Sequence, residues 1–144
     1  MMLSPHLSLA EFIVTNHRGI DNTLPHELVD TAMDTADMVE RIRSVLGDRP
    51  IIVSSGYRCL ELNRAIGSAD TSDHLKALAV DFICPGYGTA YEVAKHLSDK
   101  VDSLGIGQLI YEQTWVHCST RKPSKDVNRI LTMRSGRYSP GVTR

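Results

Sequence analysis

The sequence predicts an α+β fold, in which a small antiparallel sheet is packed against one long helix near the N-terminus. Apolar residues recur at steps of three and four throughout residues 25–47, as on one face of an amphipathic helix. The β-rich runs that follow are short and are interrupted by turns and short helical segments, so they need not pair in parallel. A chain of 144 residues is long enough for one domain with a hydrophobic core, and we expect residues 1–144 to form a single domain.

The N-terminal part is expected to contain a short helix followed by the long one. Ser8 and Glu11 have the spacing of a capping box, so a helix is predicted over Ser8–Phe12. Pro25 suits the first turn of the long helix, because the N–H that proline lacks would be unpaired there in any case. Gly47 is a typical helix terminator. The apolar face between these two residues is expected to pack on the sheet.

The rest of the chain alternates β-rich runs with two short helical segments and ends in a tail that contains glycine and proline. Glycine, proline, serine and aspartate clusters mark the boundaries of these runs. The predicted strands are Pro50–Ser55, Leu78–Ile83, Gln108–Glu112, Thr114–Ser119 and Arg129–Arg134, and the predicted helices are Cys59–Ile66 and Ala90–Leu97, the second capped by Thr89.

Composition argues against several functional classes. A formal net charge of −1 gives no reason to expect a nucleic-acid partner or an anionic membrane surface. Three cysteines without a C-x-x-C spacing argue against a disulfide framework and against a cysteine-rich zinc knuckle. No apolar run approaches the roughly 18 residues of a membrane span, and the N-terminus lacks the regions of a signal peptide. We expect a monomer that is made in the cytoplasm without a signal peptide.

The first candidate functional residues are His74, Asp81 and His117. Asp81 lies within the apolar run Leu78–Ile83, and a carboxylate in a core strand is costly to bury unless it is paired or bound to a metal. Two histidines and an aspartate suit a zinc ion that keeps a fourth position open for water, and such an ion lowers the pKa of its water to about 7 and polarises a carbonyl. The spacing alone is common in proteins. Asp81 could instead be hydrogen-bonded to a loop, and His117 could be a core histidine with satisfied hydrogen bonds.

Further candidates come from short motifs that occur in one order along the chain. The motifs are Gly19-Ile20-Asp21-Asn22, Ser54-Ser55-Gly56-Tyr57-Arg58-Cys59, Leu62-Asn63, Gly67, Ser72-x-His74, Ala79-x-Asp81, Trp115-Val116-His117-Cys118-Ser119 and Asn128-Arg129. This series resembles the zinc D-alanyl-D-alanine carboxypeptidases. It is most similar to the small phage- and prophage-type branch of that family, whose fold is related to the hedgehog signalling domain. The resemblance covers nearly the whole chain.

The resemblance implies a zinc ion bound by His74, Asp81 and His117, with Ser72 lining the substrate site. It also implies that Arg58 holds a substrate carboxylate or carbonyl, and a guanidinium fork matches a carboxylate in geometry and charge. A surface salt bridge at a helix start is the alternative for Arg58. The implied activity is hydrolysis of D-amino-acid-containing peptide bonds in the stem peptides or cross-links of bacterial peptidoglycan, by a carboxypeptidase or an endolysin-like endopeptidase. Such an enzyme would reach the wall after release from the cell or as part of a phage particle.

Two positions depart from the usual motifs of that family. Ala77 stands where a glycine usually follows the first histidine by three residues, and alanine is strained there by roughly 1 kcal/mol or more if the backbone needs a positive φ. Many relatives place an acidic residue three before the last histidine, where this chain has Thr114. Glu112 is therefore our candidate for the catalytic base that carries a proton to the leaving amine. On a regular strand Glu112 would face away from His117, so a bulge or tight turn at Gln113–Thr114 must re-aim it.

These departures leave two other hypotheses open. One is a non-catalytic, zinc-stabilised module that binds the cell wall or forms part of a virion, motivated by Ala77 and by the displaced Glu112. The other is an α+β domain without a metal. Cys84 and Cys118 flank the candidate site in sequence, and both are expected to be buried strand residues. Cys84 could also be a fourth zinc ligand, but it would then close the site to water.

Overall fold

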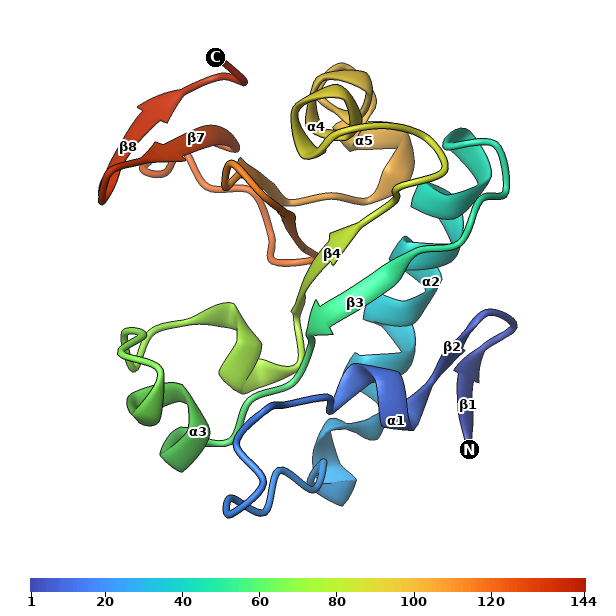
Figure 1. The fold of residues 1–144 in the computed structure, drawn as a ribbon, viewed down its shortest axis with the longest axis vertical. Coiled ribbons are helices and arrows are strands. Elements are labelled where there is room, and N and C mark those ends of the chain that lie inside the picture. Colours follow the sequence, from blue (N-terminus) through green and yellow to red (C-terminus); the bar gives the residue numbers. More distant parts are fainter.

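The computed structural model describes residues 1–144 and has a six-stranded sheet at its centre (Figure 1). The strand order is β3-β4-β6-β5-β7-β8, and neighbouring strands are antiparallel except β5 and β7, which run parallel. The predicted α+β class is confirmed, and the single parallel pair is the departure from a purely antiparallel sheet. The strands are β3 (Ile52–Ser55), β4 (Ala79–Ile83), β5 (Gln108–Tyr111), β6 (Val116–Ser119), β7 (Ile130–Arg134) and β8 (Arg137–Pro140).

Local signals in the sequence explain where the helices begin and end. The predicted capping box of Ser8 with Glu11 forms, and Thr89, which was predicted only as a helix cap, forms a second capping box with Glu92. The long helix begins after one 3₁₀ turn that follows Pro25 and ends shortly before the left-handed Gly47. The α-helices are α1 (Leu9–Phe12), α2 (Val29–Val45), α3 (Leu60–Ala65), α4 (Ala90–Leu97) and α5 (Val101–Leu104), and the 3₁₀ helices are η1 (His26–Leu28) and η2 (Asp73–Lys76).

The hydrophobic core lies between one face of the sheet and the helices α2 and α4. Helix α2 contributes Met38 and Ile42, and helix α4 contributes Val93 and Leu97, to a single buried cluster. Because side chains alternate along a strand, every second residue of the central strands joins this cluster: Val80 and Phe82 of β4, Leu109 and Tyr111 of β5, and Val116 and Cys118 of β6. The residues between them face the opposite side of the sheet. None of the helices is long and apolar enough to cross a membrane.

Two strand pairs at the ends of the chain were not predicted. The N-terminal strands β1 (Met2–Ser4) and β2 (Leu7–Ser8) form a separate small hairpin. The C-terminal tail forms β8, which pairs with β7 through a tight turn at Ser135–Gly136, where φ is +52° and +76°. Two successive residues with positive φ are typical of a type I′ hairpin turn. This hairpin forms one edge of the sheet and becomes a wall of the cleft described below.

Ala77 has the positive φ that the sequence raised as a source of strain. Its φ is 59° and ψ is 24°, and its side chain is fully buried. We expect Ala77→Gly to change the free energy of unfolding by less than about 1 kcal/mol, because relief of left-handed strain offsets the lost methyl burial and the added chain entropy. We expect Ala77→Val to lower it by about 3 kcal/mol, because a β-branched residue is both strained and overpacked there. Urea denaturation of the two variants measures this contrast, and equal destabilisation by both would contradict it.

Candidate metal centre

Strand register places Asp81 and His117 side by side on the face of the sheet that lies opposite the core. They are direct partners across β4 and β6. Their neighbours in each strand belong to the hydrophobic cluster, so alternation directs Asp81 and His117 to the other face. His117 Nδ1 lies 2.9 Å from Asp81 Oδ1. The two residues therefore form one buried cross-strand pair, although they are far apart in the sequence.

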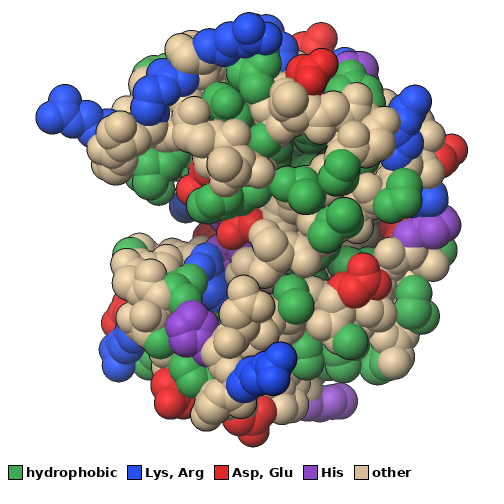
Figure 2. Space-filling view, in the orientation of Figure 1, with side chains coloured by type: hydrophobic (Ala, Val, Ile, Leu, Met, Phe, Trp, Pro, Cys, Tyr) green, Lys and Arg blue, Asp and Glu red, His purple; other side chains and the backbone are tan.

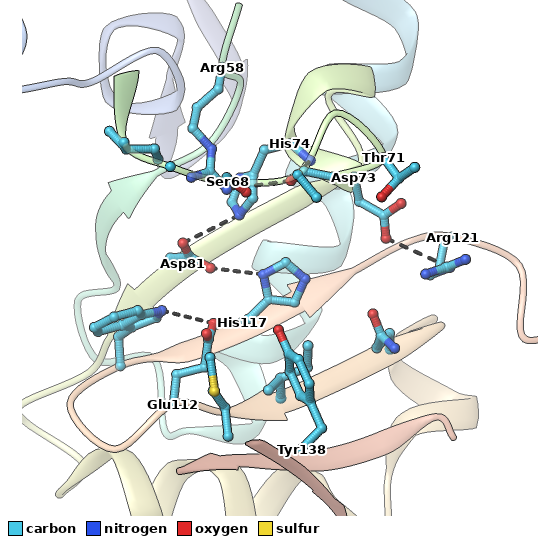
Figure 3. A pocket seen from close by; sticks show the side chains of 18 residues that line it. Arg58, Ser68, Thr71, Asp73, His74, Asp81, Glu112, His117, Arg121 and Tyr138 are labelled. Atoms are coloured by element: carbon cyan, nitrogen blue, oxygen red, sulfur yellow. Dashed lines mark hydrogen bonds and ion pairs between the residues drawn. The ribbon is translucent and has the colours of Figure 1, made fainter. Parts of the chain in front are cut away.

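His74 reaches the same carboxylate from helix η2. The Ser72 hydroxyl caps this helix by accepting from the His74 backbone N–H at 3.3 Å, and the left-handed Ala77 ends it. The chain then turns directly into β4, which carries Asp81, so His74 lies above that strand (Figure 3). His74 Nε2 is 3.3 Å from Asp81 Oδ2, and His74 Nδ1 is 2.6 Å from the Gly56 carbonyl oxygen. His74 is 1% exposed.

The environment of His74 fits a metal ligand. When His74 Nδ1–H donates to the Gly56 carbonyl, the tautomer is fixed and Nε2 carries a lone pair. Burial lowers the pKa of His74, which favours the neutral ring, and Nε2 has no hydrogen-bond partner. Its lone pair faces an ionised carboxylate, an arrangement that is favourable when a cation lies between them. Two ligand atoms of a tetrahedral zinc ion are ~3.3 Å apart, which matches the separation of His74 Nε2 and Asp81 Oδ2.

All three candidate ligands converge closely enough to hold one ion. One ligand atom from each of His74, Asp81 and His117 lies within 4.8 Å of the others, and all three residues are buried. Burial opposes ionisation of Asp81, but its electrostatic interactions with His74 and His117 and its hydrogen bond with His117 outweigh burial and hold the pKa of Asp81 well below its usual range. Burial also opposes protonation of His117, but its hydrogen bond to Asp81 and the nearby carboxylate charges raise its pKa. Asp81 is thus an anionic ligand, and a metal would replace the proton held by His117.

Glu112 enters the same site because the chain turns sharply after β5. Gln113 has a φ of 69°, the Glu112 N–H donates to the Trp115 carbonyl at 3.0 Å, and the Thr114 N–H donates to the Glu112 carbonyl at 2.8 Å. This tight turn directs the Glu112 carboxylate toward His117 (Figure 3), and Trp115 Nε1 donates to Glu112 Oε2 at 3.0 Å. Burial raises the pKa of Glu112, and the charge of Asp81 raises it further. The geometric condition for Glu112 that the sequence posed is therefore met.

Arg58 faces the site and makes no salt bridge. It lies just before Cys59, the N-cap of helix α3, but it is only 8% exposed, which contradicts the alternative of a surface ion pair. Its Nε has no hydrogen-bond partner, and its Nη2 is 3.5 Å from the Ser72 hydroxyl. The charges of Asp81 and Glu112 favour the guanidinium, although burial is the larger influence and lowers its pKa. A buried guanidinium with free N–H donors is suited to an anionic or carbonyl ligand.

These residues line a cleft with a volume of about 640 Å³, within the usual range for small-ligand sites. Figure 2 shows it as a deep notch in the molecular surface. The loop that follows helix α3 forms one wall, and Met133 and Tyr138 of the β7–β8 hairpin form the other. Ser72, which the resemblance places at the substrate site, also lies on this lining.

Other lining residues were missed by the sequence analysis. Gln108 could have been found, because alternation puts it on the same face as His117, whereas Tyr138 lies on a strand that was not predicted. Asp73 Oδ2 accepts a hydrogen bond from the Ser119 hydroxyl at 2.8 Å and lies 3.7 Å from Arg121 Nε. The missed lining residues with polar side chains are Ser68, Thr71, Asp73, Gln108, Arg121 and Tyr138.

Neither cysteine beside the motifs belongs to the site. Cys118 is fully buried on the core side of β6, and burial raises the pKa of its thiol. Cys84 is also buried, and its thiol lies 3.9 Å from the Arg49 carbonyl oxygen. Cys84 is therefore not a fourth member of the His74–Asp81–His117 cluster, which leaves the cleft side of that cluster open.

The α+β fold and a His-Asp-His cluster with a half-buried glutamate beside it have the parts of a metal-dependent hydrolase. A family model described as peptidase M15 matches residues 5–119. The chain therefore belongs to the peptidase M15 family, the zinc D-alanyl-D-alanine carboxypeptidase family, which confirms the resemblance seen in its motifs. The protein is thus a metallopeptidase by family. No curated protein sequence matches the chain.

Proposed function

We propose that this protein is a zinc peptidase that hydrolyses D-amino-acid-containing peptide bonds of bacterial peptidoglycan. The observation that carries the proposal is the convergence of His74, Asp81 and His117 on one point, with Glu112 and Arg58 beside them in the same cleft. These side chains come from separate segments of the chain, and each matches a role that the reaction needs. Zinc held by the three ligands would activate a water molecule and polarise the scissile carbonyl.

The chain's own residues would orient the substrate and move the proton. Glu112 would accept a proton from the attacking water and pass it to the leaving amine. The raised pKa of Glu112 suits the first half of this task, because it makes the carboxylate a better base toward water. Trp115 holds the carboxylate in place through its indole N–H. Arg58 would bind a carboxylate or carbonyl of the substrate, and Ser72, 3.5 Å from Arg58, lies on the same side of the cleft.

The position of Glu112 supports catalytic turnover over the alternative of a non-catalytic wall-binding or virion module. That alternative was motivated by Ala77 and by the displaced Glu112, and the turn at Gln113 answers the second point by placing the Glu112 carboxylate in the cleft. We further propose that the enzyme meets its substrate at the cell wall, after release from the cell or as part of a phage particle.

The direct test is digestion of purified peptidoglycan by the zinc-loaded protein, followed by mass spectrometry of the soluble fragments. The proposal expects new amine termini within the stem peptides or cross-links, and none when a chelator is present. If protein that contains zinc releases no new amine termini, the peptidase proposal fails. Binding to intact peptidoglycan without cleavage would then favour the non-catalytic module.

Arg58→Lys keeps the positive charge but loses the planar fork. We expect it to lower kcat/KM by about 10- to 100-fold, mainly through KM, because a hydrogen bond to a charged group contributes about 1.5–3 kcal/mol. Steady-state kinetics on a synthetic stem peptide measure the effect. Arg64→Lys is the matched control, because Arg64 lies on α3 in an exposed pair with Asp70 and does not line the cleft. Equal kinetics in both variants would argue against substrate binding by Arg58.

A further inference from the structure

A second hollow adjoins the cleft at Arg58 and Asp81, which line both. It has a volume of about 380 Å³ and shares Arg58, Ile66, Asp81 and Trp115 with the larger cavity. The shared residues include one of the candidate metal ligands and the candidate substrate-binding arginine. The two hollows therefore meet at the metal centre and together form one groove that passes across it.

Two segments that do not line the first cavity form the outer part of the second. One is the loop after α1, which contributes Asn16 and His17, and the other is β3, which contributes Ser54 and Ser55. The hydroxyl and amide groups of these side chains can donate to and accept from a peptide backbone. A volume of about 380 Å³ is within the range of sites that bind a small ligand by themselves.

The groove also extends away from the metal centre in the other direction. Figure 3 places Thr71, Asp73 and Arg121 on the opposite side of His117 from Asp81 and Arg58. Arg121 and Asp73 lie 3.7 Å apart, so each offsets the charge of the other. The lining on this side is polar, and no unpaired arginine closes the groove.

Arg58 lies where the two hollows join. A carboxypeptidase recognises the free carboxylate of the last residue, so its anion-binding group belongs at a closed end of the site, one residue beyond the scissile bond. Arg58 has an unpartnered Nε and is buried, yet space continues past it into the second hollow. A peptide that is bound by Arg58 can therefore extend further on that side.

We infer that the enzyme cleaves an internal bond, as an endopeptidase, with substrate residues bound in the groove on both sides of the metal centre. This inference rests on the proposed peptidase function. Arg58 then binds a backbone carbonyl or an internal carboxylate of the residue next to the scissile bond. In the reaction the amide C–N bond breaks, the oxygen of water forms the new C–O bond, and the leaving amine gains a proton, so that both products are peptides.

The test compares two substrates in separate reactions with the zinc-loaded protein. One is a monomeric stem pentapeptide that ends in D-alanyl-D-alanine, and the other is a cross-linked stem-peptide dimer. The inference expects internal cleavage, a kcat/KM at least about tenfold higher for the dimer, and no free alanine. Free D-alanine from the pentapeptide as the main product would overturn the inference and leave the peptidase function intact. Failure to cleave either substrate would overturn the peptidase function, and the inference with it.

A variant that fills the second hollow tests the groove itself. Asn16→Trp places a large ring in an exposed loop of that hollow, and it should lower kcat/KM for the dimer at least about tenfold without changing Tm. Arg18→Trp is the matched control, because Arg18 is exposed in the same loop and lines neither hollow. Equal activity of Asn16→Trp and the control on the dimer would show that the second hollow does not bind substrate.

Discussion

Replacing Glu112 with glutamine is expected to lower kcat by about 10²- to 10⁴-fold, the usual contribution of a positioned general base. Glutamine has nearly the same shape as glutamate and can still accept the hydrogen bond from Trp115 Nε1, which spans 3.0 Å. It cannot accept a proton from water. Since Glu112 is not a member of the His74–Asp81–His117 cluster, the variant should bind zinc as the wild type does.

Kinetics on a synthetic cross-linked peptide, with zinc content measured on the same samples, test this expectation. Glu61→Gln is the matched control, because Glu61 is exposed in helix α3 and does not line the cleft. A Glu112→Gln variant that retains more than about a tenth of the wild-type kcat would show that another group moves the proton.

Zinc is expected to raise the thermal stability of the metal-free protein strongly. A ligand that binds only the folded state stabilises that state by about 4 kcal/mol when its concentration is about a thousand times its dissociation constant. For a domain of this size that corresponds to a rise in Tm of more than about 10 °C. Asp81→Asn should remove most of this rise in Tm, because the variant loses the negative charge between His74 and His117. The asparagine side chain still has an oxygen that can accept a hydrogen bond from His117 Nδ1.

Thermal unfolding with added zinc and with a chelator measures the shift. Asp70→Asn is the matched control, because Asp70 is exposed and pairs only with Arg64 on the surface. If zinc stabilises Asp81→Asn as much as the wild type, the ion binds elsewhere. If zinc stabilises neither protein, the His74–Asp81–His117 cluster does not bind zinc in the folded state.

Local signals made most of the elements predictable. The capping box at Ser8, the helix cap at Thr89 and the end of the long helix near Gly47 are all found where the sequence predicts them. The position of Asp81 inside an apolar strand was sufficient to mark its carboxylate as paired or metal-bound, and the structure places it on the face opposite Val80 and Phe82. These features depend on residues close together in the chain, where sequence spacing directly reflects geometry.

The features that sequence could not predict depend on register or on unusual backbone conformations. The pairing of Asp81 with His117 requires the register of β4 against β6, which spacing does not specify. The approach of Glu112 requires a positive φ at Gln113, a residue type that rarely adopts it. The second wall of the cleft requires β8, whose residues are all exposed and so lack a clear hydrophobic pattern.

The central claim is that His74, Asp81 and His117 together hold one zinc ion, and metal analysis of purified protein tests it most directly. We expect about one zinc per chain in the wild type and in His26→Ala, a control in which an exposed histidine outside the cleft is removed. We expect almost none in His117→Ala. A wild-type protein that binds no zinc, or a His117→Ala variant that retains a full equivalent, would contradict this claim.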